Sequence, residues 1–333
     1  MDRQQNDSGP ISENGQGHSA PTPSDIPKPG WWSIGKRVYA SLGSKNLSIL
    51  AAGVAFYAML SVFPALAALV AIYGLIADPG TVQQQIHAIH GLIPGEAQKV
   101  IETYLKSIVS SNSSKLGIGL IVSVLIALWS ARAGTVSLIQ ALNITYEEPE
   151  KRGVIRFQAL AIGMTVAAIA SAIIALTLVA ALPAAMHFLP FSAYAKIAGY
   201  VVTWIILVVL VSIGLAAAYR FLPSRREPKW RWVSWGGVIA TLIWVAASAA
   251  FSVYVAKFGN YDKTFGSLGA VVVLLTWLYL SAYVVLVGAC FNAEMERQTA
   301  RDTTTGAEKP MGRRGAKMAD TVADEHPAET AET

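Results

Sequence analysis

Residues 197–219 read IAGYVVTWIILVVLVSIGLAAAY and contain no Asp, Glu, Lys or Arg. An α-helix needs about 20 apolar residues to cross a hydrocarbon core of about 30 Å. This run is therefore long enough to span a membrane. Buried helices of soluble proteins rarely stay free of charge over such a length.

Five more stretches share this character. Four of them contain no charged residue, and residues 116–146 contain only Arg132. The 333-residue chain is 53% hydrophobic and 14% charged, whereas soluble domains have about 25% charged residues. We predict an all-α, polytopic transmembrane helical bundle of about six spans, within a membrane domain at residues 31–296. The spans are expected near residues 48–77, 116–140, 157–182, 197–219, 232–256 and 267–291.

The segments outside the predicted spans are polar. Residues 1–30 are rich in Pro, Ser, Gly, Asn and Gln and lack the apolar core of a secretory signal. Their composition predicts a disordered tail, and residues 297–333 predict a second one. Residues 81–112 carry apolar residues at helical spacing on both sides of Pro94-Gly95. They predict an amphipathic helical hairpin outside the membrane, on the extracytoplasmic side.

The basic residues predict the orientation. Six spans place both tails on the same side, and the segments on that side carry most of the Lys and Arg residues, notably from Arg220 to Arg231. Because cytoplasmic loops are enriched in Lys and Arg, we expect both termini in the cytoplasm. The net charge of +5 follows from this topology, so no nucleic-acid partner is expected. The expected partners are membrane lipids and, in a homo-oligomer, a second copy of the chain.

Arg132 is a charged residue inside a predicted span. It lies about 24 Å along the helix from the start of that span, at 1.5 Å per residue. A charge within the bilayer often marks a pathway or an ion pair, and Glu294, at a similar predicted depth, is the partner we consider. The alternative is that Arg132 extends to the cytoplasmic interface. Residues 133–146 favour this alternative because they resemble an interfacial helix, with Ile139 and Leu142 on its apolar face.

Polar residues at the inner ends of two spans are further functional candidates. Asn143 and Tyr146 follow the second span, and Asn292 and Glu294 close the sixth. Glu294 lies beyond the length that a helix needs to cross the membrane, so we expect it at the inner interface.

Two other features concern the outer half of the membrane domain. Tyr261, Asp262 and Lys263 precede the sixth span, either as a turn that starts the helix or as an outward-facing polar mouth. Pro64 lies in the middle of the first span and is expected to kink or break that helix.

Motifs for metal binding and catalysis are weak or missing. His87 and His90 are three residues apart, but two histidines without a third ligand make a weak metal signal. No Walker A loop, GxSxG, HExxH or paired-cysteine zinc pattern occurs. We therefore predict no metal site, no cofactor and no enzymatic activity. Cys290 is the only cysteine, so the chain forms no intrachain disulfide.

Motifs along residues 47–297 resemble the BrkB/YihY family of bacterial inner-membrane proteins, in order and in spacing. They are LAAGVAFY at 50–57, LSVFP at 60–64, Trp129-Ser130 with Ala141-Leu142-Asn143 and Tyr146, YDKTFGSLGA at 261–270, and GACFNAE at 288–294.

The resemblance implies a multi-pass protein of the bacterial inner membrane with six spans. It implies less about activity, since the family has carried the label ribonuclease BN and some members are linked to serum resistance or lipid export. Many members read GAELNAE at the end of the sixth span, where this chain has Cys290 and Phe291 in place of the first Glu and the Leu.

Three functions follow as hypotheses. The first is transport or export of a small molecule or a lipid. The second is a non-transporting envelope or scaffold protein, with the hairpin at 81–112 as its contact surface. The third, a ribonuclease, needs metal ligands or a general acid–base pair in an aqueous site, and the residues do not support it.

Overall fold

The computed structural model describes residues 15–76, 116–188, 193–258 and 268–323. In this part of the chain the regular elements are helices, and the one β-bridge joins Pro228 to Thr304. The short 3-10 helix η1 and the amphipathic helix α1 come first, and six long helices follow. The bounds are η1 Pro23–Asp25, α1 Lys28–Ser44, α2 Leu47–Ile76, α5 Leu116–Thr145, α6 Val154–Phe188, α7 Ala193–Phe221, α8 Trp230–Phe258 and α10 Leu268–Gln298.

The six long helices are each long and apolar enough to cross a membrane, judged by length and composition. Their middle sections bury few side chains within the chain. Large apolar residues of α7 such as Val201, Trp204 and Ile213 are exposed, as expected for surfaces that face lipid tails. The all-α fold with six spans is therefore confirmed.

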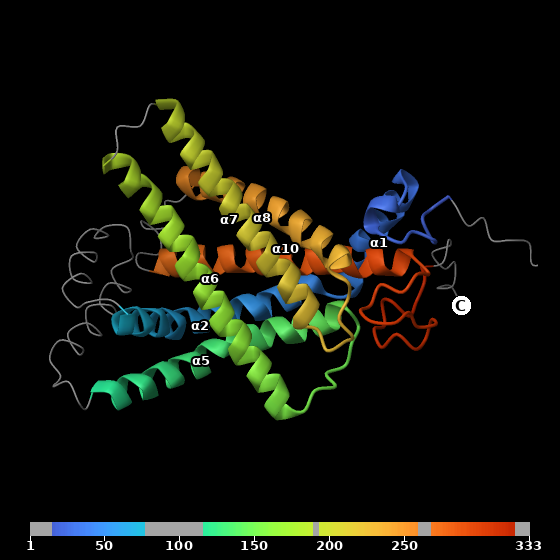
Figure 1. Cartoon of the computed structure of the whole chain (residues 1–333), viewed down its shortest axis with the longest axis horizontal. Coiled ribbons are helices and arrows are strands. Elements are labelled where there is room, and N and C mark those ends of the chain that lie inside the picture. The colour runs from blue at the N-terminus through green and yellow to red at the C-terminus, as the bar shows by residue number, and fades with distance from the viewer. Residues whose placement is uncertain (1–14, 77–115, 189–192, 259–267, 324–333) are drawn as a thin grey trace, which may run out of the picture.

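The helices run back and forth between two ends of the molecule. Helices α2, α5 and α10 lie side by side, α8 packs against both α10 and α7, and α6 connects α5 to α7 (Figure 1). The first and last described segments, residues 15–30 and 299–323, lie at one end of this bundle, on the right of Figure 1. We call it the basic end. It consists of residues 15–46, 146–153, 222–229 and 299–323 together with the adjoining helix ends.

Helix α5 is continuous from Leu116 to Thr145. The expectation that residues 133–146 form a separate helix on the membrane surface is therefore wrong. Ile139 and Leu142, which this expectation places on the apolar face of that helix, are fully buried within the bundle. A Cβ atom on Gly134 would lie 3.3 Å from the Cα of Ala58, so the small residue allows α5 to approach α2 closely and to remain within the bundle.

Helix α2 also runs through its proline. Pro64 lies inside the 30-residue helix Leu47–Ile76, so the predicted break does not occur. Membrane helices tolerate proline because neighbouring groups satisfy the carbonyl that it leaves free. The kink predicted there stays a prediction, and the hairpin predicted at residues 81–112 lies outside the described residues.

Parts of both predicted tails are folded. Arg314 is buried and its guanidinium donates hydrogen bonds to the carbonyls of Ala300 at 2.6 Å and Ala319 at 2.6 Å. A shortage of apolar residues predicts disorder, but here buried polar contacts order the backbone instead. The expectation of a disordered segment is therefore wrong for residues 299–323.

The N-terminal segment is ordered in the same way, by contact with the C-terminal segment. The backbone N–H of Ala300 donates to the carbonyl of His18 at 2.7 Å. The hydroxyl of Thr299 donates to the carbonyl of Ala20 at 2.8 Å. The expectation of disorder is thus also wrong for residues 15–30, because these polar contacts hold the two ends of the chain together.

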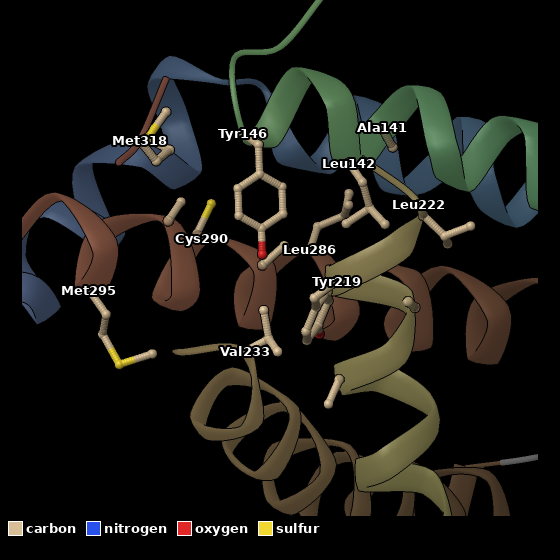
Figure 2. Packing of buried hydrophobic residues seen from close by; sticks show 14 of the residues in the cluster. Ala141, Leu142, Tyr146, Tyr219, Leu222, Val233, Leu286, Cys290, Met295 and Met318 are labelled. Carbon is tan, nitrogen blue, oxygen red and sulfur yellow. The ribbon is translucent and has the colours of Figure 1, made fainter. Parts of the chain in front are cut away.

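The main cluster of buried apolar residues lies towards the basic end. Tyr146, Tyr219, Trp232 and Leu286 are among its largest fully buried side chains. Figure 2 shows the Tyr146 ring extending from the end of α5 towards α10. This core fixes the ends of α5, α7, α8 and α10 relative to one another, and it surrounds the polar residues considered next.

Candidate functional site

A buried ion pair lies at the centre of the basic end. Arg225, in the loop between α7 and α8, donates to both carboxylate oxygens of Glu296 on α10, at 2.7 Å and 2.9 Å. Both side chains are 0% exposed. Removing one partner of such a pair leaves an uncompensated buried charge, which costs about 3–5 kcal/mol. The pair therefore holds the loop firmly on the last turns of α10.

Tyr146 completes this arrangement. The guanidinium carbon of Arg225 lies 4.0 Å from the centre of the Tyr146 ring, within the range of a cation–π contact. Burial alone would lower the pKa of Arg225, but the negative charge of Glu296 raises it above its usual value. Burial raises the pKa of the Tyr146 phenol, and the charge of Arg225 opposes that shift. Arg225 therefore stays charged and Tyr146 neutral.

Glu294 makes a second ion pair close by. Its carboxylate accepts a hydrogen bond from the Nε of Arg37 on α1 at 2.8 Å and contacts Arg297 at 3.4 Å. The predicted pair between Arg132 and Glu294 is therefore wrong. Glu294 lies four residues before the end of α10, whereas Arg132 lies thirteen before the end of α5. At 1.5 Å per residue these depths are about 6 Å and about 20 Å.

Two buried asparagines bind backbone groups. The side chain of Asn143 accepts from the backbone N–H of Ser224 at 2.7 Å and donates to Glu150 at 3.0 Å. It therefore ties the end of α5 to the loops on either side of it.

Asn292 connects α10 to α8. Its side chain accepts from the backbone N–H of Gly236 at 2.9 Å and donates to the carbonyl of Val233 at 3.3 Å. A Cβ atom on Gly236 would overlap the Asn292 amide, so this contact depends on the glycine.

The structure thus brings four of the candidates, Asn143, Tyr146, Asn292 and Glu294, to the basic end. Their polar contacts are made with other parts of the same chain. We interpret them as the group that positions α1, α5, α8 and α10, not as a site that binds a ligand.

A cavity of about 460 Å³ lies elsewhere, among α2, α5 and α6. Its lining combines small residues with three hydroxyl groups. The small residues are Ala58, Ala65, Ala131, Gly134, Ala168 and Ala172, and the hydroxyls belong to Ser61, Thr135 and Thr165.

The hydroxyls in the cavity wall connect the three helices. The hydroxyl of Ser61 accepts from the backbone N–H of Gly134 at 2.9 Å, and the hydroxyls of Thr135 and Thr165 are 2.8 Å apart. Ser61 lies fourteen residues from the start of α2, and Thr165 lies eleven from the start of α6. The cavity is therefore about 16–21 Å from the basic end, near the middle of a hydrocarbon core of about 30 Å.

Arg132 lies beside this cavity without lining it. Its neighbours Ala131 and Gly134 form part of the wall, and its guanidinium carbon lies 3.9 Å from the centre of the Trp129 ring. Its Nε is buried and has no hydrogen-bond partner among the described residues. Since Arg132 is about 20 Å from the end of α5, its side chain is too short to reach the basic end. This depth favours the intramembrane alternative over the interfacial one.

The remaining candidates are outside the described part of the chain. This is the case for Tyr261, Asp262 and Lys263 and for the two histidines His87 and His90. Cys290 is a buried free thiol. Within residues 15–76, 116–188, 193–258 and 268–323, no three His, Cys, Asp or Glu residues gather closely enough to hold a metal ion.

Sequence reasoning missed Arg225, Glu296 and the three hydroxyls. One signal could have pointed to Glu296. A carboxylate in the last turn of a helix faces the negative end of the helix dipole, so it needs a cationic partner when it is buried. The hydroxyl residues gave no such signal, because Ser and Thr often bond only within their own membrane helix.

Comparisons with known proteins agree with this architecture. The family model described as Virulence factor BrkB matches residues 38–312. A putative ribonuclease-like protein, YfkH, of Bacillus subtilis is 28% identical over 74% of this chain and 89% of its own length. UPF0761 membrane proteins are also similar. The protein of Psychromonas ingrahamii is 25% identical over 75% of this chain and 83% of its own length. The protein of Kangiella koreensis is 24% identical over 77% of this chain and 62% of its own length. No solved structure matches the chain.

Proposed function

Since the chain belongs to the BrkB family of multi-pass membrane proteins, we propose that it transports or exports a small molecule or a lipid across the bacterial inner membrane. The observation that supports this function most directly is the cavity among α2, α5 and α6. Transporter binding sites are typically found near the middle of the bilayer, and this cavity lies at that depth.

The cavity opens onto the surface of the bundle, and its size and lining suit a ligand. Ligand pockets occupy roughly 300–1,000 Å³ and combine apolar walls with a few polar groups. The cavity of about 460 Å³ falls in that range.

The orientation is part of the proposal. The basic end carries Lys45 just before the first span, and Lys151, Arg152, Arg225 and Arg226 on short connections between spans. By the preference of Lys and Arg for cytoplasmic loops, we place the basic end and both termini in the cytoplasm. A reporter that works only in the cytoplasm should then be active when it is fused to either terminus. A reporter that works only outside the cytoplasm should be inactive at both.

We further propose that the protein is not a nuclease, although the name of the Bacillus relative speaks of a ribonuclease. Glu294 and Glu296 are each held by an arginine at 2.8 Å or less. A general acid or base must be able to reach the proton that it transfers, and these ion-paired, buried carboxylates cannot approach an RNA backbone. Metal-dependent RNA cleavage by the highly purified protein would contradict this view.

The transport proposal is tested in proteoliposomes. The probes are phosphatidylglycerol and phosphatidylethanolamine with a fluorescent label, together with a panel of small organic anions, and the readout is transfer across the bilayer. We expect Ala168→Leu, which narrows the cavity from an exposed position of its wall, to abolish transfer of at least one probe. Thr165→Val should reduce the same transfer.

Thr276→Val is the matched control for the hydroxyl. Thr165 and Thr276 each donate to the carbonyl four residues earlier at 2.8 Å, but only Thr165 lines the cavity. If wild-type protein moves none of the probes, or if Ala168→Leu moves them as fast as wild type, the cavity is not a transport site.

A further inference from the structure

A second, larger cavity lies at the basic end, between the first turns of α6 and the end of α7. Its volume is about 840 Å³. Six cationic side chains line it and one carboxylate, that of Glu227, faces them. The cations are Lys151, Arg152, Arg156, Arg220, Arg225 and Arg226.

Four of the six cations are neutralised by a carboxylate, at distances of 2.7–2.9 Å. These ion pairs are Lys151–Glu148, Arg152–Glu150, Arg220–Glu227 and Arg225–Glu296. Arg156 and Arg226 have no carboxylate partner in the part of the chain that the structure describes. Six positive charges against four negative ones leave a net charge of +2, which is carried by these two arginines.

The two unpaired arginines are held differently. The Nε of Arg226 donates to the carbonyl of Thr305 at 2.9 Å, which fixes its guanidinium beside the C-terminal segment. Arg156 is exposed in the first turn of α6. The N-terminus of a helix is its positive end, so the helix dipole adds to the charge of Arg156 instead of offsetting it. Both features favour an anion at this place.

The cavity becomes apolar towards the middle of the membrane. Leu160 and Met164 follow Arg156 at intervals of four residues and therefore lie below it on the same face of α6. Both line the cavity, and so does Phe221 at the end of α7. Met164 is eight residues from Arg156, or about 12 Å deeper in the membrane. A cationic rim thus continues into an apolar wall along the direction of the membrane normal.

We propose that this cavity binds the phosphate-bearing headgroup of an anionic phospholipid, with the phosphate at Arg156 and Arg226 and an acyl chain along Leu160 and Met164. Basic pockets between membrane helices are a typical setting for anionic headgroups. A soluble phosphate would match only the rim, whereas a lipid matches both the rim and the wall. The proposal does not depend on transport, since the mid-membrane cavity is lined by a different set of residues.

The test measures lipid binding by native mass spectrometry of the delipidated, full-length protein in detergent. It is titrated with phosphatidylglycerol, with phosphatidylcholine, or with phosphatidylglycerol in the presence of inorganic phosphate. We expect one phosphatidylglycerol to bind with higher affinity than phosphatidylcholine. Arg156→Gln should weaken it about tenfold, the loss expected for one charge-assisted hydrogen bond. The double variant with Arg226→Gln should weaken it further.

Arg231→Gln is the matched control. Arg231 is an exposed arginine in the first turn of α8, at the same end of the bundle, but it does not line this cavity. The proposal is overturned if Arg156→Gln binds phosphatidylglycerol within twofold of Arg231→Gln. It is also overturned as a lipid site if inorganic phosphate displaces phosphatidylglycerol and Leu160→Ser binds it as tightly as wild type. Because Arg156 is exposed, its single variant is expected to fold.

Discussion

The guanidinium of Arg225 stacks on the ring of Tyr146 at 4.0 Å while both of its terminal nitrogens bind Glu296. One side chain from the loop before α8 therefore contacts the end of α5 and the last turns of α10 at the same time. The arrangement is dry, since the side chains of Arg225 and Glu296 are 0% exposed. The contribution of each of these residues to the free energy of unfolding can be measured with single substitutions.

The Arg225–Glu296 pair should dominate the stability of the basic end. We expect Glu296→Gln to lower the free energy of unfolding by about 3–5 kcal/mol, because it leaves the Arg225 charge buried without compensation. Thermal or denaturant unfolding in detergent checks this. Glu147 is the control: its carboxylate pairs with Lys45 and Lys317 and is 36% exposed, so Glu147→Gln should cost no more than about 1 kcal/mol. Equal losses in the two variants would show that burial does not matter here.

The Tyr146 ring should matter more than its hydroxyl. Tyr146→Leu removes the aromatic face under Arg225 and is expected to lower the free energy of unfolding by about 2 kcal/mol from the cation–π contact alone. Tyr146→Phe keeps that face and should lose less. The same unfolding measurement compares the two variants, and an equal loss in both would exclude the cation–π contact as the cause.

The approach of α8 to α10 should depend on Gly236. A Cβ atom there would overlap the side-chain oxygen of Asn292, so Gly236→Ala should destabilise the fold by about 1–3 kcal/mol through overpacking. A Cβ atom on Gly163 of α6 would meet nothing within 4 Å. Gly163→Ala should therefore be neutral or stabilising, by up to about 1 kcal/mol, and unfolding in detergent compares the two variants.

A double variant separates space from hydrogen bonding at the same contact. Asn292→Ala creates room for the methyl group of Gly236→Ala, so the double variant should lose less stability than the sum of the two single losses. Strict additivity would mean that the two residues do not compete for the same space.

The Glu150–Arg152 pair should contribute a pH-dependent stability. Hydrogen bonds from Arg152 lower the pKa of Glu150 from 4.5 to about 2, although burial acts in the opposite direction. A carboxylate whose pKa is lower in the folded state stabilises the fold above its unfolded pKa and loses this effect as the pH falls. The difference in melting temperature between wild type and Glu150→Gln should therefore shrink between about pH 4.5 and about pH 2. A difference that stays constant over this range would contradict the assignment.

The membrane architecture could be predicted from the sequence, because a run without charge such as residues 197–219 has few stable alternatives to a spanning helix. The ends of the helices are harder to predict. Motifs identify Tyr146 and Asn292 as candidates, but the partners of both residues come from distant parts of the chain. Arg225 and Glu296 are 71 residues apart, and nothing local in the sequence pairs them.

The depth of Arg132 in the membrane could not be predicted from the sequence for a different reason. Counting from the first apolar residue of the span places it near the inner interface, at the level of Glu294. The helix instead continues to Thr145, because the small residue Gly134 keeps that second half against α2. Depth in a membrane is set by where a helix ends, and in this chain packing decides that point.

The hydrogen bonds between the N-terminal segment and the end of α10 have a consequence for biosynthesis. The side chain of Gln298 donates to the carbonyl of Gln16 at 2.8 Å, across 282 residues of sequence. At about 5–20 residues per second, roughly 15–60 s of translation separate the emergence of these two partners. The N-terminal segment must therefore remain without its final contacts until α10 has been made, so this end of the protein closes only after the sixth span is synthesised.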